Sequence, residues 1–295
     1  MIKVIRNIEG ILRAIDKIVS RWTSNVRRAW FHGFVVGDGS YTCLYKQRTD
    51  IGVETTHLGT LLSFSVVAYR LSHNGYVRVY SYPKRDRKSY STWKFRAYIC
   101  SQEEHDLLCS KSPYEILELF SETLDELAAY TAGFIDSDGT IVLSVKKRYR
   151  PKPHYYLEPE IIIVNKDKHL LELLREKWIE YGIYGNVHKH PDNLYRYSIS
   201  AKSEITKFLN CIIRYMLNIE RLGKAHLLLT ILEEKVMIQP LDLRISIKRY
   251  NDLLIKMKNE VSQLAKEMYK KNKSLIIAKE RITIVGKNGI HKIDP

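Results

Sequence analysis

Two short stretches of the chain nearly repeat each other at a distance of 100 residues: Ala29-Trp-Phe-His-Gly-Phe-Val-Val-Gly-Asp-Gly39 and Ala129-Tyr-Thr-Ala-Gly-Phe-Ile-Asp-Ser-Asp-Gly139. In each stretch a small residue recurs at every fourth position, at 29, 33 and 37 and at 129, 133 and 137. On an α-helix this spacing leaves one face without large side chains, so two such helices can approach closer than the usual ~8–10 Å between axes. We therefore predict two helices that pair in parallel through these faces.

Both stretches end on Asp-Gly, which predicts how the helices end. We expect Gly39 and Gly139 to adopt the left-handed conformation that terminates helices, which places Asp38 and Asp138 at the same end of the pair. A helix C-terminus carries a partial negative charge, so two carboxylates there are unfavourable unless a cation is close. Oxygen ligands of this kind suit a hard divalent cation such as Mg²⁺. The alternative is a simple polar turn after each helix, but two copies at matched spacing favour a metal site.

The two stretches resemble the LAGLIDADG motif, and two copies in one chain resemble the single-chain LAGLIDADG homing endonucleases. The resemblance implies that the eighth motif residue, here Asp38 or Asp138, is catalytic and binds the metals. It also implies that the preceding residue, Gly37 or Ser137, offers a backbone carbonyl to the metal.

The first copy departs from the motif at its sixth position, where Val36 replaces the acid that Asp136 retains. The family usually adds a basic residue near each active site, which can offset transition-state charge. Lys111 in the first half, and Arg221 or Lys224 in the second, lie near the matching place in the sequence. We expect these three residues to be catalytic as well.

The composition favours a polyanionic partner. The 295 residues include 48 Lys and Arg against 33 Asp and Glu, a formal net charge of +15, and such an excess is typical of proteins that bind nucleic acid. No apolar run approaches the ~20 residues of a membrane-spanning helix, so we expect no membrane partner. The four cysteines, at positions 43, 100, 109 and 211, form no Cys-x-x-Cys pair. We therefore expect neither zinc nor a redox motif, but reduced thiols in an intracellular protein, either cytoplasmic in a prokaryote or organellar.

The order of elements repeats after each motif. The first half predicts strands at 40–48, 51–56, 76–82 and 91–99, with helices at 58–71 and 102–120. The second half predicts strands at 140–147 and 160–165, a hairpin at 186–200, and helices at 168–181 and 203–217. Each half thus follows the order α-β-β-α-β-β-α. The predicted fold class is α+β, with two pseudo-twofold-related halves that are antiparallel sheets on helices, joined by the motif helices.

Four segments follow from this organisation. We predict an N-terminal helical extension over 1–28, a first LAGLIDADG half over 29–121, a second over 122–235, and a C-terminal extension over 236–295. Toward the C-terminus the residue pattern predicts helices at 224–238, across the last segment boundary, and at 243–273, followed by a weakly patterned tail with one strand.

The alternation of the strands predicts one apolar face and one polar face in each sheet. A two-stranded ribbon fits the DNA major groove, where Arg and Lys read guanine. Polar outer faces are ordinary in antiparallel sheets, but these faces are expected to be mostly positive with almost no acids. The predicted DNA-binding residues are Lys46, Arg48, Arg78, Tyr80, Lys94, Arg96, Lys146, Arg148, Arg150, His188, His190 and Arg196.

We therefore expect a monomeric, site-specific endonuclease that cuts both strands of double-stranded DNA, hydrolysing one phosphodiester in each with divalent metals. The resemblance implies an intron-encoded enzyme that leaves short 3′ overhangs. It also implies that Mg²⁺ is the cofactor, that Mn²⁺ substitutes for it, and that Ca²⁺ binds without supporting cleavage. The alternatives are an RNA-binding maturase that acts on its own intron RNA and a non-cleaving DNA-binding regulator on the same fold. The presence of both acids, Asp38 and Asp138, favours the enzyme.

Overall fold

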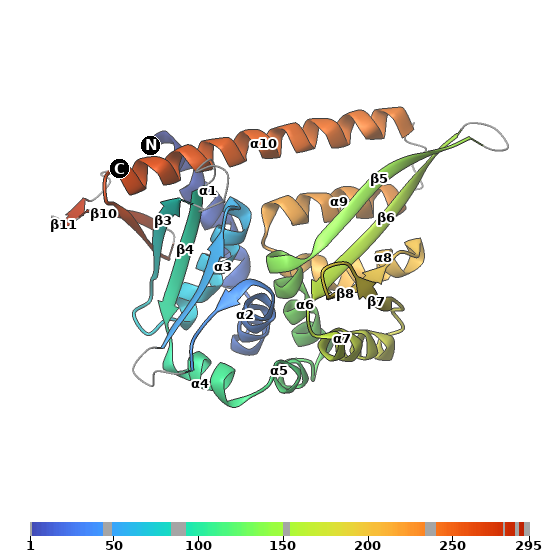
Figure 1. Cartoon of the computed structure of the whole chain (residues 1–295), viewed down its shortest axis with the longest axis horizontal. Helices are drawn as coiled ribbons and strands as arrows, with labels where there is room; N and C mark the ends of the chain where they lie inside the picture. Colours follow the sequence, from blue (N-terminus) through green and yellow to red (C-terminus); the bar gives the residue numbers. More distant parts are fainter. Residues whose placement is uncertain are drawn as a thin grey trace.

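A pair of helices forms the centre of the molecule, and one antiparallel sheet lies on each side of it (Figure 1). The helices are α2 (Ser24–Asp38) and α6 (Leu124–Asp138). The structure is a computed structural model that describes residues 2–43, 49–83, 93–149, 154–233, 240–279, 281–286 and 289–291. The predicted fold class, α+β with two sheets on helices joined through the motif helices, is confirmed.

The small residues of the two motifs bring the backbones of α2 and α6 into direct contact. A Cβ atom on Gly33 would lie 1.9 Å from the carbonyl oxygen of Tyr130, and one on Gly133 would lie 2.0 Å from that of Trp30. The residues that lie 100 positions from Gly33 and Tyr130 are Gly133 and Trp30, and they make the same contact. This equivalence is what a pseudo-twofold axis requires. A Cβ on Gly37 would lie 2.0 Å from Ser137 Oγ, so the two helices run in the same direction and their C-termini meet.

The two helices end differently from the prediction. Gly39 has φ −71° and Gly139 has φ −79°, which is extended backbone rather than the left-handed conformation. Glycine is needed for space instead: an added Cβ would lie 2.4 Å from the carbonyl oxygen of Val35 at Gly39, and 2.6 Å from Ile135 Cα at Gly139. The chain therefore turns directly from the last helical turn into the next strand.

The first half follows the predicted order with one break. After α2 come β1 (Gly39–Ser40), β2 (Asp50–Thr55), α3 (Leu58–Leu71), β3 (Val77–Pro83), β4 (Trp93–Cys100), α4 (Gln102–Ser110) and α5 (Pro113–Leu119). The single helix predicted over 102–120 is wrong, because Pro113 starts a new helix that Ser112 caps together with Glu115. Most of the strand predicted at 40–48 lies outside the described residues.

The second half repeats this arrangement, with its first two strands longer and its last two shorter than those of the first half. It contains β5 (Thr140–Arg148), β6 (His154–Asn165), α7 (Lys168–Glu180), β7 (Asn186–His190), β8 (Leu194–Ile199), α8 (Lys202–Ile212), the 3₁₀ turn η1 (Ile213–Tyr215) and α9 (Ile219–Glu233). Its strand order, β5-β6-β8-β7, matches the order β1-β2-β4-β3 of the first half. The helix predicted over 203–217 is thus shorter and ends in the 3₁₀ turn.

The two ends of the chain add elements to this core. Helix α1 (Ile2–Val19) buries Leu12, Ile15 and Val19, and α10 (Pro240–Lys270) runs along one side of the molecule past both sheets (Figure 1). The tail forms β9 (Ser274–Ala278), β10 (Arg281–Gly286) and β11 (Gly289–His291), where one strand was predicted. These strands extend the first sheet beyond β3, so the tail completes the first half. The predicted segment boundaries at 28/29, 121/122 and 235/236 stay predictions.

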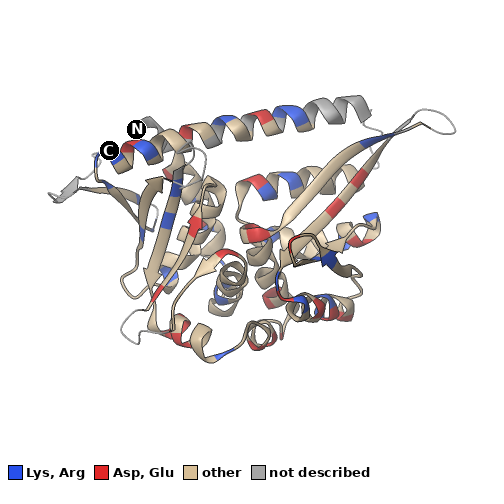
Figure 2. Cartoon of the chain, viewed as in Figure 1, with Lys and Arg blue, Asp and Glu red and all other residues tan. Residues whose placement is uncertain are grey.

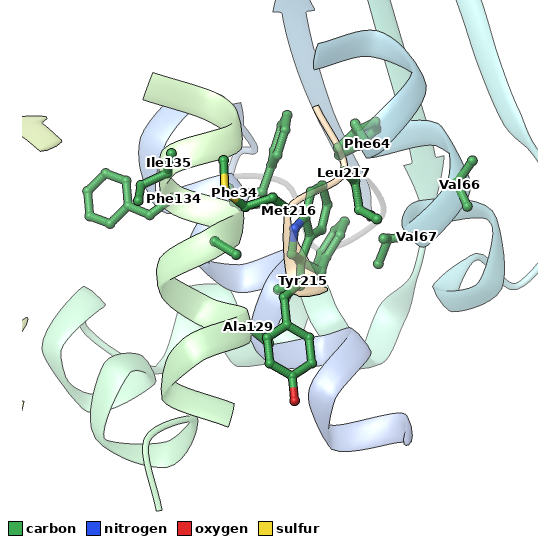
Figure 3. Packing of buried hydrophobic residues seen from close by; sticks show 14 of the residues in the cluster. Phe34, Phe64, Val66, Val67, Ala129, Phe134, Ile135, Tyr215, Met216 and Leu217 are labelled. Atoms are coloured by element: carbon green, nitrogen blue, oxygen red, sulfur yellow. The ribbon is translucent and has the colours of Figure 1, made fainter. Parts of the chain in front are cut away.

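The apolar faces of the motif helices form one continuous core. Figure 3 shows Phe34 on α2, Phe134 and Ile135 on α6, and Phe64 on α3, with the segment that carries Met216 between α6 and α3. In β4, Phe95 and Ala97 are buried as the alternation predicts. None of the helices in the described part of the chain has the length and apolar character that a membrane span requires.

The prediction of reduced thiols is wrong for one pair of cysteines. Cys43 and Cys109 form a disulfide with a Cα–Cα distance of 5.5 Å, which ties the segment after β1 to α4. Cys100 and Cys211 are free. The two partners lie 66 residues apart in the sequence, so no local spacing could reveal them. The thiols were the reason for expecting an intracellular protein, and that location stays a prediction.

The contact between α2 and α6 predicts unequal effects of two glycine substitutions. Gly33→Ala forces a methyl group into the backbone of α6, and we expect it to lower the free energy of unfolding by about 3 kcal/mol or more. Gly10→Ala is the control, because nothing lies within 4 Å of a Cβ at Gly10 on α1. It should raise stability by up to about 1 kcal/mol through helix propensity. Urea unfolding followed by circular dichroism measures both, and equal stabilities would contradict the packing.

Candidate active site

The C-terminal ends of α2 and α6 bring Asp38 and Asp138 together. A Cβ atom on Gly37 would lie 3.3 Å from Asp138 Cβ, so the two motif ends are in contact. Both aspartates reach the surface, whereas Ser137 is buried. The site is therefore a surface position whose floor is the crossing of two helices.

The surroundings of the two carboxyl groups raise the pKa of each. For Asp38, burial raises the pKa, while the positive charges of Arg221, His57 and Lys94 oppose the shift. For Asp138, partial burial and the charge of Asp38 raise the pKa to about 6, and the charge of Arg221 opposes this shift. The charge of Asp38 thus makes ionisation of Asp138 less favourable, and a cation between the two carboxylates would oppose this effect.

Arg221, near the start of α9, caps the end of α6. Its Nε donates to the Gly139 carbonyl at 2.8 Å and its Nη2 to the Ser137 carbonyl at 2.9 Å, while Nη1 donates to the Asp136 carbonyl. The last carbonyls of a helix lack partners within the helix, so this guanidinium satisfies them and places a positive charge beside both aspartates. Arg221 was predicted as a basic catalytic residue that offsets transition-state charge, and the structure brings it to the site.

The acid at the sixth position of the second motif has a structural environment. Asp136 is fully buried, and its Oδ2 accepts from the backbone N–H groups of Leu217 at 2.6 Å and Asn218 at 3.1 Å. Burial raises the pKa of Asp136 to about 7, which these hydrogen bonds and the charge of Arg221 oppose. Asn218 also donates to Thr60 Oγ1 at 3.2 Å on α3. Asp136 therefore holds the segment before α9 against both halves of the molecule.

The donor set at the helix ends fits a hard divalent cation. The repulsion that Asp38 exerts on the ionised form of Asp138 is relieved when a positive ion joins the two carboxylates, and oxygen ligands are those that Mg²⁺ prefers. Within the described residues, no group of three or more His, Cys, Asp or Glu side chains is placed to hold a metal. Asp38 and Asp138 would hold such an ion together with backbone carbonyls, water and phosphate oxygens. Of the two predicted carbonyl ligands, that of Ser137 already accepts from Arg221.

The other predicted basic residues are placed differently. Lys111 is exposed at the end of α4, and no contact among the described residues joins it to either aspartate. Lys224 lines a cavity of about 250 Å³ between β5, α9 and α10. Lys94, predicted to bind DNA, is one of the positive charges that act on Asp38. The catalytic roles of Lys111 and Lys224 stay predictions.

The outer face of the first sheet carries paired charges. Arg78 donates to Tyr80 at 3.4 Å, and Tyr80 stacks on Tyr98 with ring centroids 5.7 Å apart. Arg96 and Lys94 both form ion pairs with Glu54. Figure 2 shows acidic as well as basic segments along the strands. The expectation of almost no acids on these faces is therefore wrong.

The second sheet has the same character. Lys146 is paired with Glu158, and Arg196 with Glu160. His188 lies opposite Arg196 on β7, and His190 ends the same strand. Among the other predicted DNA-binding residues, Lys46, Arg48 and Arg150 lie outside the described residues, and so does the side chain of Arg148, which ends β5.

Several residues of the site were missed in the sequence. His57, the residue that directly precedes α3, and Asn218 lie in connections whose position depends on the fold of the other half. Glu54 and Glu160 could have been found, because they alternate with buried residues in their strands as the basic residues do. The predicted polar faces included only cations, hydroxyls and rings, and these two acids belong on them as well.

Part of the chain is similar to a known protein family. The family model described as LAGLIDADG endonuclease matches residues 131–229, which confirms the resemblance predicted from the motifs. A search among curated proteins finds no match.

Three solved structures illustrate the likeness. I-DmoI in complex with DNA and Mn is 20% identical, with 64% of this chain and 97% of that chain covered and a TM-score of 0.41. The meganuclease I-SmaMI bound to uncleaveable DNA is 15% identical, with 81% and 95% covered and a TM-score of 0.44. The N-terminal LAGLIDADG domain of DUF199/WhiA is 12% identical, with 70% and 89% covered and a TM-score of 0.46.

The raised pKa of Asp138 predicts a pH dependence of stability. The pKa of Asp138 is about 6 in the folded chain and about 4 in an unfolded one, so the folded state binds this proton more tightly. Protonation of Asp138 therefore stabilises the folded state fully below pH ~4, and this stabilisation is lost as the pH rises through 6. Asp138→Asn removes the ionisation, so in EDTA the variant should gain about 1–2 kcal/mol relative to the wild type between pH 4 and pH 7. Urea unfolding at both pH values measures the gain. Asp252→Asn, on the exposed side of α10, is the control, and an equal gain there would contradict the assignment.

Proposed function

We propose that the chain is a homing-type, site-specific endonuclease that cuts both strands of DNA, because residues 131–229 match the LAGLIDADG endonuclease model and the first half repeats the strand order of the second around a shared helix pair. The observation that carries the proposal is the contact between the two motif ends, which places two carboxylates at one surface position between two sheets. A structural role does not explain carboxylates at two helix C-termini, where the helix dipoles oppose them.

The residues of the site have distinct tasks in this proposal. Asp38 and Asp138 hold divalent metal, which when bound activates water and stabilises the attacking and leaving oxygens of each phosphodiester. Arg221 keeps the end of α6 in place and supplies a permanent positive charge, and Lys94 and His57 add charge on the side of Asp38. Asp136 and Asn218 keep Arg221 in register by anchoring the segment before α9.

The two sheets bind the duplex on either side of the cut. Each sheet buries one face against helices and exposes the other, where Arg and Tyr side chains of β3 and β4 in the first half correspond to His of β7 and Arg of β8 in the second. One chain carries both halves, so the enzyme acts as a monomer. In this proposal Mg²⁺ is the cofactor, Mn²⁺ substitutes for it, and Ca²⁺ binds without supporting cleavage. The cut leaves short 3′ overhangs, and the enzyme is encoded within an intron.

Cleavage of a randomised duplex library tests the proposal. With Mg²⁺ we expect one enriched cleaved sequence, and Asp38→Asn or Asp138→Asn should lower the rate at least ~100-fold, because each removes a metal ligand. Binding to the selected duplex should persist in both variants, since each loses a negative charge near phosphate. Lys168→Gln on α7, which is exposed and paired with Glu172, is the control.

Two results would contradict cleavage. Specific binding of duplex without any metal-dependent cut would point to a DNA-binding regulator on this fold, and specific binding of intron RNA alone would point to a maturase. Full activity in both aspartate variants would show that the paired carboxylates are not the catalytic groups.

A further inference from the structure

An arginine on the outer face of each sheet is held by a glutamate from another strand of that sheet. Arg96 lies on β4 and Arg196 on β8, 100 residues apart. Glu54, the partner of Arg96, lies on β2, and Glu160, the partner of Arg196, lies on β6. Since β4 is hydrogen-bonded to β2 and β8 to β6, each pair joins two neighbouring strands, but the residue opposite Arg196 is Val164, and Glu160 lies four residues away from it along β6.

The pair in the first sheet is highly constrained. Glu54 is directly opposite Arg96 in the β2–β4 register, and Arg96 Nε donates to Glu54 Oε1 at 2.8 Å while Nη2 donates to the same oxygen. The Arg96 guanidinium also lies over the Tyr82 ring, 5.5 Å from its centroid. Burial would raise the pKa of Glu54, but hydrogen bonds from Tyr82 and Arg96 and the charges of Arg96 and Lys94 hold it below its usual range. The carboxylate therefore stays ionised and fixes the arginine.

The pair in the second sheet is more buried. The Arg196 side chain is 22% exposed and Glu160 is 25% exposed, against 56% for Arg96. Arg196 Nη2 forms the ion pair, and its Nε is buried without a hydrogen-bond partner. A guanidinium has five donors, so in both pairs donors remain for a ligand beyond the glutamate.

The first pair also faces an open space. A hollow of about 580 Å³ is lined by Arg96 and Glu54 together with Tyr98, Gly52, Asp50 and the segment 40–42. Ser40 follows the catalytic Asp38 by two residues, so the hollow begins next to the proposed cut and extends outward along the sheet. A base edge in this hollow would meet the arginine within the same half of the site.

An acid on a surface that binds DNA needs an explanation, because it repels phosphate. An exposed ion pair contributes only about 0–1 kcal/mol to stability, so stability does not account for it. A free arginine loses up to about 2 kcal/mol of side-chain entropy when it is fixed on a base. A glutamate that fixes it beforehand removes part of that cost and selects one orientation, and an oriented arginine pairs with the O6 and N7 atoms of guanine.

We propose that Glu54 and Glu160 are positioning residues that hold Arg96 and Arg196 so that each arginine reads one guanine, one in each half of the target. The inference rests on the proposed function, since it requires a sequence-specific DNA-binding surface. In each sheet the glutamate and the arginine thus act together in reading one base pair, and such a pair is called a specificity unit below.

Binding selection from a randomised duplex library, with the full chain in Ca²⁺ at fixed salt, tests this unit. Arg96→Gln should lose the preference for guanine at one position of the site, a change of about 5- to 150-fold in relative affinity. Glu54→Gln should relax the same position and leave the others unchanged, while overall affinity rises. Arg196→Gln and Glu160→Gln should relax one position in the other half.

Two further variants separate orientation from charge. Glu54→Asp keeps the charge but shortens the side chain, so orientation predicts relaxed specificity without the rise in affinity, whereas a pure charge effect predicts wild-type behaviour. Glu172→Gln removes an exposed acid paired with Lys168 on α7 and should change neither quantity. Unfolding curves check that each variant folds, and Glu54→Asp and Glu54→Gln serve as independent tests of the same residue.

The outcomes distinguish the two proposals. If the wild-type chain selects no sequence, the proposed function fails. If it selects a sequence but the Arg96 and Glu54 variants change different positions, or none, the function stands and the specificity unit is wrong. If the two arginine variants weaken every sequence equally, the arginines only contact phosphate, which also overturns the inference.

Discussion

The backbone contact between Gly33 and Tyr130, with its counterpart between Gly133 and Trp30, is the constraint on which the rest of the structure depends. Helices normally keep ~8–10 Å between their axes because side chains intervene. Here the missing side chains let the helices touch, so their ends are set by the backbone itself. The position of the two carboxylates, the relation of the two sheets, and the pseudo-twofold axis all follow from that contact.

The same contact creates an electrostatic conflict. The C-termini of two helices and two carboxylates lie together, so negative charge accumulates there. Arg221 compensates part of this charge, because it caps α6 and lies beside both aspartates. This compensation differs between the two aspartates: Asp38 also has Lys94 and His57 as positive neighbours, whereas Arg221 is the positive charge that acts on Asp138. A site with this residual negative character is suited to a divalent cation and to the phosphates that such a cation brings.

Much of this architecture could be predicted from the sequence, because the decisive features are local. The spacing of Gly33 and Gly133 predicted the helix pair, and the alternation of Phe95 and Ala97 predicted the buried sheet face. The conformation of Gly39 could not be read locally, since its role is to make room for Val35 rather than to turn the chain. The break at Pro113 was open to prediction, because proline starts helices more readily than it continues them.

Long-range partners were beyond the sequence for a physical reason. The disulfide of Cys43 with Cys109, and the tail strand β9 beside β3, join residues that are brought together only by the completed fold. Arg221 was among the basic residues predicted, but its role as a helix cap depends on the turn that Asp136 anchors. The pairing of Arg96 with Glu54 depends on the register of β2 against β4, which the residue pattern of a single strand does not reveal.

The central claim is that the paired carboxylates need a cation, and metal-dependent stability tests it most directly. Thermal unfolding of the wild type and of Asp38→Asn/Asp138→Asn, in EDTA and in rising Ca²⁺, separates the two states without any need for cleavage. The account predicts that the double variant is the more stable protein in EDTA, and that only the wild type gains stability with Ca²⁺, by about 2.7 kcal/mol at a hundred times its dissociation constant. A wild type that is the more stable in EDTA and indifferent to Ca²⁺ would contradict it.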